Sequence, residues 1–563
     1  MPRSIQSLRG YTPRKFAADL GAGITVGLVA LPLAMAFGIA SGVTPEAGLY
    51  TAVVAGFVIS ALGGSRVQIG GPTGAFVVIV AGIVAKFGLS GLTLVTLMAG
   101  VLLVIMGVTG LGSAVKFIPR PVIIGFTNGI ALLIASTQVK DFLGLKTGAA
   151  PSNFVPRMKV LAEHLGTVSW PTVGLGCATL AIILVWPRVS RRIPGSILAV
   201  LACTATAAAL GLHVETIGTR FGGIPQGFPR LALPHLHAEH ILPLLPSALT
   251  VALLGAIESL LSAVVADGMS GDRHNSNVEL VAQGVANLAA PLFGGIPATG
   301  AIARTATNIR AGARTPVSGM VHALTLLLVL LAAAPLARFI PLSTLAAVLF
   351  VVSWNMGEWR EIGGVLRMAK ADIAVWLATF TLTVVADLTV AVGVGMALAA
   401  LLYIYRIAET TTVTRVTPEY LQEGLAHVLQ DKEIPEEAAI LRIHGPFLFG
   451  ATQKLEEATE ELSELPAIVI LRLRNMTALD ATGLHALEVF ADRLRASGRT
   501  LLLCGARDQP AELIARADFI EEVGRENILP HVQAALRRAR EISGGLNRVG
   551  METRREMELV EIG

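Results

Sequence analysis

Two short stretches decide the fold, IGGPTGAF at residues 69–76 and GGIPATGAIARTATN at residues 294–308. Each carries a Thr-Gly-Ala tripeptide, Thr73-Gly74-Ala75 in the first and Thr299-Gly300-Ala301 in the second. Each tripeptide follows a Gly-Gly pair and opens a short apolar segment. Segments of this length fail to cross a hydrocarbon core of ~30 Å at 1.5 Å per residue. We therefore predict two half-helices that begin inside a membrane.

The sequence around the two stretches is that of a membrane protein joined to a soluble domain. Apolar residues make up 53% of the chain and charged residues only 15%, and the charge is concentrated after residue 410. This balance is outside the range of an ordinary soluble protein. The predicted parts are a cytoplasmic N-terminus (1–15), a transmembrane transport domain (16–409), a linker (410–437), a small α/β domain (438–545) and a C-terminal tail (546–563).

Hydropathy divides residues 16–408 into fourteen predicted membrane segments. Basic clusters follow the sixth, tenth and twelfth segments, which places those ends and both termini in the cytoplasm. The two short segments are the third and the tenth. Because the tenth segment comes seven positions after the third, the halves have opposite orientations. This is the 7+7 inverted repeat in which interrupted helices mark the substrate site of secondary transporters.

The residue types at the two half-helices predict an anion site. A helix N-terminus leaves its first N–H groups unpaired and carries partial positive charge. Gly lets a backbone approach a ligand closely, and Thr adds a hydroxyl without net charge. The alternative interpretation is that Pro, Thr and Gly only permit close helix packing.

Three polar residues in apolar surroundings are candidates for function. Glu258 is the only ionisable residue of the eighth segment, and a carboxylate there is costly enough to favour a role as proton acceptor or cation ligand. Ser262 lies one turn later on the same helix face. Arg304 follows Gly300 by about one turn and would add positive charge beside the half-helix or pair with Glu258.

These stretches, with ALPLAMAFGIASGVTPEAGLY (30–50) and GAIESLLSAVVAD (255–267), resemble the sulfate permease (SulP) family with its C-terminal STAS domain. The resemblance covers nearly the whole chain. It implies an α-helical polytopic fold like that of the uracil permeases, with core and gate subdomains and an elevator motion. The residues that it implies for the anion site are Thr73, Gly74, Ala75, Gly300, Ala301, Ile302 and Arg304, with Leu33 and Phe37 from the first segment.

This chain also resembles the cyanobacterial sodium-dependent bicarbonate transporter. That transporter binds sodium through side-chain oxygens, whereas this chain has Glu258, Ser262 and Ile302 at the corresponding positions. The missing hydroxyl at Ile302 removes a ligand for a hard cation. We therefore predict proton-coupled symport of sulfate, bicarbonate or a dicarboxylate. The alternatives are a sodium-coupled bicarbonate symporter and a membrane protein that senses anions without moving them.

The soluble domain is expected to regulate transport. Residues 440–445, 467–473 and 500–505 are predicted strands, each followed by an amphipathic helix. The loop with Asp480 and Thr482 resembles the phosphorylated loop of anti-sigma-factor antagonists, which makes Thr482 the candidate for modification. The alternative is that Asp480 and Thr482 only cap the next helix.

Other classes of function lack support in the sequence. The three cysteines are far apart, and we expect no disulfide framework, metal site or cofactor. No catalytic triad or phosphate loop is visible, so we expect neither an enzyme nor a nucleic-acid partner. The expected partners are a small anion, a proton, the lipid bilayer and a second copy of the chain, in a bacterial inner membrane.

Overall fold

The computed structural model describes residues 1–8, 10–113, 118–148, 151, 153–190, 194–225, 227, 231, 241–386, 388–416, 434–457, 465–517 and 519–544. The chain divides into two units, Met1–Ala399 and Ala400–Gly563. Most of the predicted linker (410–437) and all of the predicted tail (546–563) lie outside the described residues.

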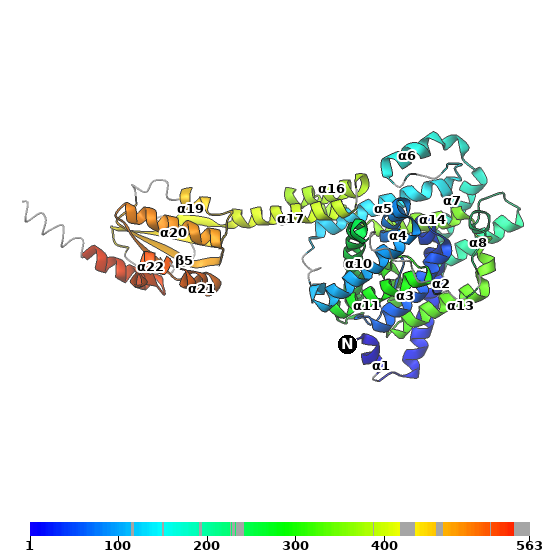
Figure 1. Cartoon of the computed structure of the whole chain (residues 1–563), viewed down its shortest axis with the longest axis horizontal. Helices are drawn as coiled ribbons and strands as arrows, with labels where there is room; N and C mark the ends of the chain where they lie inside the picture. The colour runs from blue at the N-terminus through cyan, green and yellow to red at the C-terminus, as the bar shows by residue number, and fades with distance from the viewer. Residues whose placement is uncertain are drawn as a thin grey trace, which may run out of the picture. The chain divides into compact units, whose positions relative to one another are not determined.

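The first unit is helical (Figure 1). Its helices are α1 (Arg3–Leu8), α2 (Pro13–Ala40), α3 (Pro45–Leu62), α4 (Gly74–Val108), α5 (Arg120–Leu143), α6 (Phe154–Glu163), α7 (Trp170–Val189), α8 (Gly195–Ala209), α9 (Ile217–Phe221), α10 (Ile241–Ser270), α11 (Ser276–Ala289), α12 (Ile302–Arg310), α13 (Val317–Ala337), α14 (Leu342–Met356), α15 (Trp359–Val365), α16 (Lys370–Val385) and α17 (Leu388–Thr410). Its two strands are β1 (Gly70–Gly71) and β2 (Thr299–Gly300).

Helices cover each of the predicted membrane segments. Among the described residues, eight helices are long and apolar enough to span a membrane. The predicted third and fourth segments are merged in α4, but Gly88 at φ 69° interrupts the helix between them. The short α12 begins at Ile302, where the second half-helix was predicted. Each predicted half-helix thus corresponds to a helical segment, the part of α4 before Gly88 and the whole of α12.

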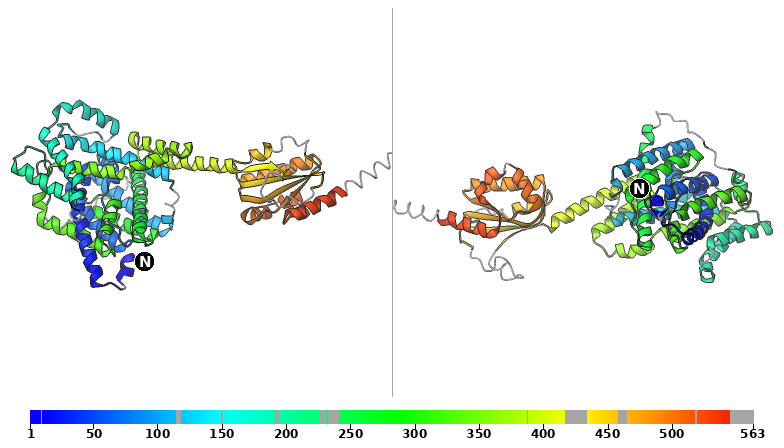
Figure 2. Two further views of the ribbon diagram at one scale, coloured as in Figure 1. Left: turned by 180° about the vertical axis from the view of Figure 1, so that it is seen from behind. Right: turned by 90° about the horizontal axis from the view of Figure 1, so that it is seen from below.

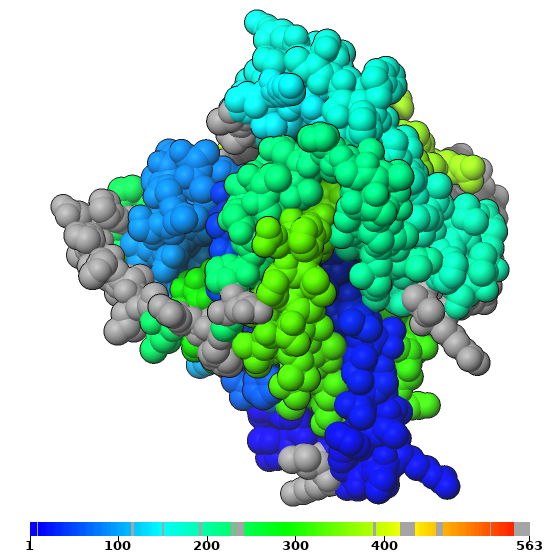
Figure 3. Space-filling view, turned by 90° about the vertical axis from the view of Figure 1, so that its right-hand side faces the viewer, coloured from blue at the N-terminus to red at the C-terminus, as the bar shows by residue number. Residues whose placement is uncertain are grey.

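Within this unit the helices pack in two groups. In one group α13 packs against α2 and α3, and α4 packs against α10 and α11. In the other, α5 packs against α14 and α16, and α7 packs against α8 and α14. Figure 3 shows α2 (blue) and α13 (light green) side by side on one face.

Glycine allows the close packing of the first group. A Cβ on Gly48 of α3 would lie 1.9 Å from the carbonyl oxygen of Ala34 in α2. A Cβ on Gly23 of α2 would lie 2.5 Å from the carbonyl oxygen of Ser318 in α13. Close backbone contact at small residues is how helices associate without a hydrophobic driving force.

The second unit contains a five-stranded sheet in the order β3-β4-β5-β6-β7, with helices on its two faces (Figure 2). Its strands are β3 (Thr412–Arg415), β4 (Ala438–Phe447), β5 (Ile468–Leu479), β6 (Thr500–Cys504) and β7 (Ile528–Leu529). Its helices are α19 (Gln453–Glu457), α20 (Ala481–Ala496), α21 (Asp508–Arg516), α22 (Phe519–Val523) and a final helix at residues 532–544.

The sheet is parallel except for its first strand. β4, β5, β6 and β7 run parallel, and β3 is antiparallel to β4. The three predicted strands are confirmed. β3 lies inside the predicted linker, so the sheet begins ahead of residue 438.

Candidate functional site

The two half-helices meet through a short strand pair. β1 and β2 are antiparallel, with Gly70 opposite Gly300 and Gly71 opposite Thr299. The Ala301 N–H also donates to the carbonyl oxygen of Ile69 over 2.8 Å. Since α4 starts directly after β1 and α12 directly after β2, this crossing brings the two helix N-termini together.

Neither helix start is closed by a side chain. Thr73 is the N-cap of α4 and Ala301 the N-cap of α12, both with extended backbone and without a side-chain cap hydrogen bond. The first N–H groups of a helix have no partner within it. These unpaired N–H groups and the partial positive charge of each helix N-terminus together stabilise a negatively charged ligand.

Two buried donors beside the crossing have no hydrogen-bond partner among the described residues. One is the Thr73 hydroxyl, and the other is Nη1 of Arg304. Arg304 is 3% exposed, and its Nη2 donates to the carbonyl oxygen of Pro72. Buried polar groups are nearly always satisfied by protein, water or ligand. These two donors therefore indicate a site for a polar ligand or water.

α10 supports the crossing from one side. The hydroxyl oxygens of Ser259 and Thr299 are 2.7 Å apart, and the Gly300 N–H donates to Ser259 over 3.1 Å. The Ser262 hydroxyl lies 3.1 Å from that of Thr305 in α12. Ser262 thus links α10 to α12, and the serine that contacts the crossing itself is Ser259, which sequence reasoning missed.

Glu258 is buried on the same stripe of α10, one turn before Ser262. Its carboxylate has no hydrogen bond or ion pair to another described side chain. The predicted alternative of an ion pair between Arg304 and Glu258 is absent from the described residues, because the guanidinium contacts Pro72 instead.

The residues predicted from the first segment have different surroundings. A Cβ on Gly74 would lie 3.4 Å from the Phe37 ring and 3.4 Å from the sulfur of Met356 in α14. Phe37 therefore lies beside the start of α4. Leu33, one turn earlier, is partly buried against the same hydrophobic core.

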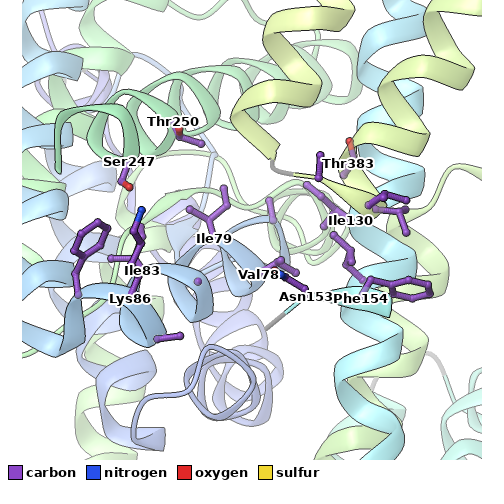
Figure 4. A pocket seen from close by; sticks show the side chains of 18 residues that line it. Val78, Ile79, Ile83, Lys86, Ile130, Asn153, Phe154, Ser247, Thr250 and Thr383 are labelled. Atoms are coloured by element: carbon purple, nitrogen blue, oxygen red, sulfur yellow. The ribbon is translucent and has the colours of Figure 1, made fainter. Parts of the chain in front are cut away.

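A cavity of about 460 Å³ lies beside Ala75, between α4, α5, α10, α16 and the start of α6 (Figure 4). Lys86 is the only charged residue among the described residues that line it. Polar groups also come from Asn153, Ser247, Thr250 and Thr383. Sequence reasoning missed this cavity because its walls come from five helices spread along the sequence.

In the second unit, Asp480 caps α20. Its carboxylate accepts hydrogen bonds from the N–H groups of Gly483 over 2.7 Å and Phe449 over 3.0 Å. The capping alternative is therefore confirmed for Asp480. Thr482 is exposed in the first turn of α20, where a modifying enzyme has access to its hydroxyl.

Comparisons with known proteins agree with this arrangement. Residues 16–379 match the sulfate permease family, and residues 430–535 match the STAS domain. The putative sulfate transporter YvdB of Bacillus subtilis is 44% identical over 525 residues, 93% of this chain and 98% of that relative.

Solved structures are also similar. The transmembrane domain of a cyanobacterium bicarbonate transporter, BicA, is 33% identical with a TM-score of 0.62, covering 69% of this chain and 98% of that one. The murine anion transporter Slc26a9 in the inward-facing state has a TM-score of 0.84 at 18% identity, over 96% of this chain and 94% of that one. The latter similarity concerns the fold alone.

Proposed function

The chain belongs to the sulfate permease family, and from this premise we propose that it is a secondary active transporter of small oxyanions or carboxylates. It is a multi-pass membrane anion transporter by its family. The relatives named for sulfate and bicarbonate make these two anions the first candidates for its cargo, with dicarboxylates as the third.

The observation that carries the proposal is the antiparallel crossing of β1 and β2, which joins the N-termini of α4 and α12. The anion lies against the first amides of both helices, at Gly74, Ala75 and Ile302, and Ala301, whose own N–H is bonded to Ile69, lines the site beside them. The Thr73 hydroxyl and the free Nη1 of Arg304 complete its hydrogen bonds. Preorganised amides of this kind stabilise charge without reorganising when the ligand arrives.

Proton coupling is assigned to Glu258. The residue is a buried carboxyl group near the crossing, with no hydrogen-bonded or ionic partner among the described side chains to keep it charged. Such a group inside a membrane domain pairs, neutralises or carries a proton. Ser262 is held by Thr305, and Ile302 offers no side-chain oxygen, which argues against sodium at this position.

The two helix groups of the first unit support an elevator mechanism. The group that contains α4, α10 and α12 carries the crossing, and the group of α5, α14 and α16 faces it across the cavity of Figure 4. Fourteen segments in a 7+7 inverted repeat, cytoplasmic termini and a homodimer complete the proposal. The proposal also includes regulation by phosphorylation of Thr482, which is exposed in the second unit.

The test is uptake into proteoliposomes that hold the purified chain. Radiolabelled sulfate and bicarbonate are offered under an inward proton gradient, an inward sodium gradient or no gradient. Accumulation that needs the proton gradient is expected. Accumulation that needs sodium would instead identify a sodium symporter. Anion-dependent thermal stabilisation without accumulation under any gradient would identify an anion sensor and overturn the proposal.

A further inference from the structure

One buried histidine of the membrane unit has no part in the site described above. His322 lies in the second turn of α13 and is fully buried. The Gly319 carbonyl, in the preceding turn, is within reach of its ring. Neither ring nitrogen has a hydrogen bond of normal geometry to a described residue. Since buried polar groups are nearly always satisfied by protein, water or ligand, this ring requires a further partner.

The His322 ring lies close to the strand crossing, on the α3 side of β1. Both α13 and β1 pack against α3. A Cβ on Gly56 of α3 would lie 3.7 Å from Cε1 and from Nδ1 of His322, and 3.2 Å from the carbonyl oxygen of Gly70 in β1. Gly56 therefore leaves room for about one methyl group between the ring and that carbonyl. A space of this size, lined by polar atoms, accepts one water molecule.

Arg304 reaches the same side of β1 from α12. Its Nη1 would lie 2.7 Å from a Cβ on Gly71, and the Cα of Ala52 would lie 3.4 Å from that Cβ. Ala52 and Gly56 are four residues apart and so lie on one face of α3. Their spacing of about 5–6 Å is the span of two consecutive hydrogen bonds of ~2.9 Å. One water molecule can therefore bridge Nη1 and the imidazole.

The two side chains have complementary hydrogen-bonding capacity. The guanidinium of Arg304 only donates, whereas a neutral imidazole has one acceptor nitrogen besides its N–H. The charge of Arg304 acts on the His322 ring. A protonated ring would place a second positive charge in the same buried space, which is costly without a carboxylate beside it. The neutral ring is therefore the form that fits, and its acceptor matches the free donor of Arg304.

We propose that a buried water molecule joins Arg304 to His322 on the α3 side of β1, and that His322 is a positioning residue of the anion site. The water accepts a hydrogen bond from Nη1 and donates to the imidazole and to the Gly70 carbonyl. Nη1 carries a second N–H, which stays available to the anion. The inference rests on the proposed anion site, because His322 acts on the anion through Arg304.

Two substitutions break this link in different ways. His322→Phe removes the acceptor, and Gly56→Ala places a methyl group where the water lies. Each should weaken binding of sulfate and of bicarbonate to the purified full-length chain about 2- to 10-fold, the effect of one hydrogen bond. His322→Gln, which keeps an acceptor oxygen, should restore most of the affinity. Titrations of anion-dependent thermal stabilisation measure these affinities.

Thr325→Val is the matched control. It removes a hydroxyl from the next turn of the same helix, where that hydroxyl donates to the Val321 carbonyl of α13 over 2.8 Å. Its anion affinity should equal that of the wild type. The unfolding temperature without anion shows for each variant whether folding is retained.

A double-mutant cycle separates this inference from the anion site itself. In the Arg304→Gln background, His322→Phe should weaken anion binding no further, because the link that it breaks is already absent. Additive losses would overturn the link. Unchanged binding by His322→Phe and Gly56→Ala, with weaker binding by Arg304→Gln, would overturn the link and leave the anion site standing. Unchanged binding by Arg304→Gln would overturn both.

The imidazole gives a second readout, which needs no anion. Nitrogen-15 signals of labelled histidine report the hydrogen bonds of each ring nitrogen, and their loss in His322→Phe or His322→Gln assigns those of His322. The signal of the acceptor nitrogen should shift in Arg304→Gln and in Gly56→Ala and stay the same in Thr325→Val. A signal that responds to neither Arg304→Gln nor Gly56→Ala would overturn the proposal, whatever the anion affinities are.

Discussion

Arg304 makes one hydrogen bond to the protein and leaves one donor for a ligand. Its Nη2 group is fixed by the Pro72 carbonyl, while Nη1 has no partner among the described residues. The first contact fixes the loop ahead of α4. The second group lies beside β1, where a Cβ on Gly71 would come within 2.7 Å of it. A single side chain thus joins the two half-helices and charges the site.

Replacing Arg304 with Gln should weaken anion binding about 10- to 100-fold, because a charge-assisted hydrogen bond contributes ~1.5–3 kcal/mol. Arg304→Lys keeps the charge but loses the paired N–H groups of the guanidinium. Its anion affinity should therefore lie between that of the wild type and that of Arg304→Gln. The measurement is anion-dependent thermal stabilisation together with KM for uptake. Arg310→Gln, at the exposed end of the same helix, is the control. Equal affinity of the Arg304→Gln variant and the wild type would remove Arg304 from the site.

Glu258→Gln should abolish the stimulation of uptake by external acid while anion binding and anion exchange persist. Gln keeps the size of the side chain and removes the titrating proton. Initial uptake rates between pH 5 and pH 8 measure the effect. Glu163→Gln, exposed at the end of α6, should keep the wild-type pH profile. A Glu258→Gln variant that also keeps this profile would place the proton elsewhere.

At the level of single residues, sequence patterns located the site but did not resolve its contacts. Thr73 and Gly300 were identifiable because the Thr-Gly-Ala motif occurs twice. Sequence analysis named Ser262 and missed Ser259, which lies three residues earlier on the face of α10 that packs against α12 and β2. The structure shows that β2 packs against Ser259, which contacts the Thr299 hydroxyl and accepts a hydrogen bond from the Gly300 N–H.

At the level of elements, a side chain at Gly300 would displace the amide of Gln68 from the crossing. A Cβ there would lie 1.8 Å from Nε2 of Gln68, which is held by the carbonyl oxygen of Ser259. Gly300→Ala should therefore lower stability by ~1–3 kcal/mol and reduce uptake, as expected for overpacking. The loss of stability is measured by thermal unfolding, and the loss of activity by anion uptake. Gly174→Ala, whose Cβ meets nothing within 4 Å, should behave as wild type. A stable, active Gly300→Ala variant would contradict the geometry of the crossing.

The cavity beside α4 should attract anions through Lys86. Lys86→Gln is expected to raise KM up to about fivefold at low ionic strength, since exposed charge interactions are worth ~0.2–1 kcal/mol. The maximal rate should stay the same. The difference in KM between the variant and the wild type should vanish in high salt, because the Debye length there falls to a few ångströms and the lysine charge is screened. Lys146→Gln, on an exposed loop, is the control. A KM that does not respond to the Lys86 charge at low salt would exclude this role.

The elements that sequence analysis predicted best are those with a local signal. Strands β4, β5 and β6 have long apolar runs, and the helix starts carry Pro or Thr. β3 was missed because it is a four-residue edge strand, mostly exposed, without the alternation that marks a buried strand. The pairing of β1 with β2 joins residues about 230 positions apart and leaves no trace in local composition.

At the scale of the whole molecule, the proposed elevator motion requires the two helix groups to move apart. A cross-link across the cavity should stop it. With the native cysteines replaced, Val78→Cys in α4 and Ile130→Cys in α5 are joined by a short bis-thiol reagent, since both residues line the cavity. Uptake should fall to background while anion binding remains.

The control joins two helices of one group. A Cβ on Gly125 of α5 would lie 3.1 Å from the Cβ of Thr379 in α16. Linking Gly125→Cys to Thr379→Cys should leave uptake intact, because these helices move together in the proposed mechanism. Full uptake with the cavity pair linked would argue for a fixed channel instead of an elevator.

The strand crossing also bears on how such a protein changes its cargo. Peptide amides are the same whatever residues carry them, so attraction for negative charge comes with the architecture and survives substitution. Discrimination between a flat and a tetrahedral anion is left to a handful of side chains, Thr73 and Arg304 among them. Mutational drift at those few positions redirects the cargo without rebuilding the scaffold, and selection experiments for a new anion should recover their changes there first.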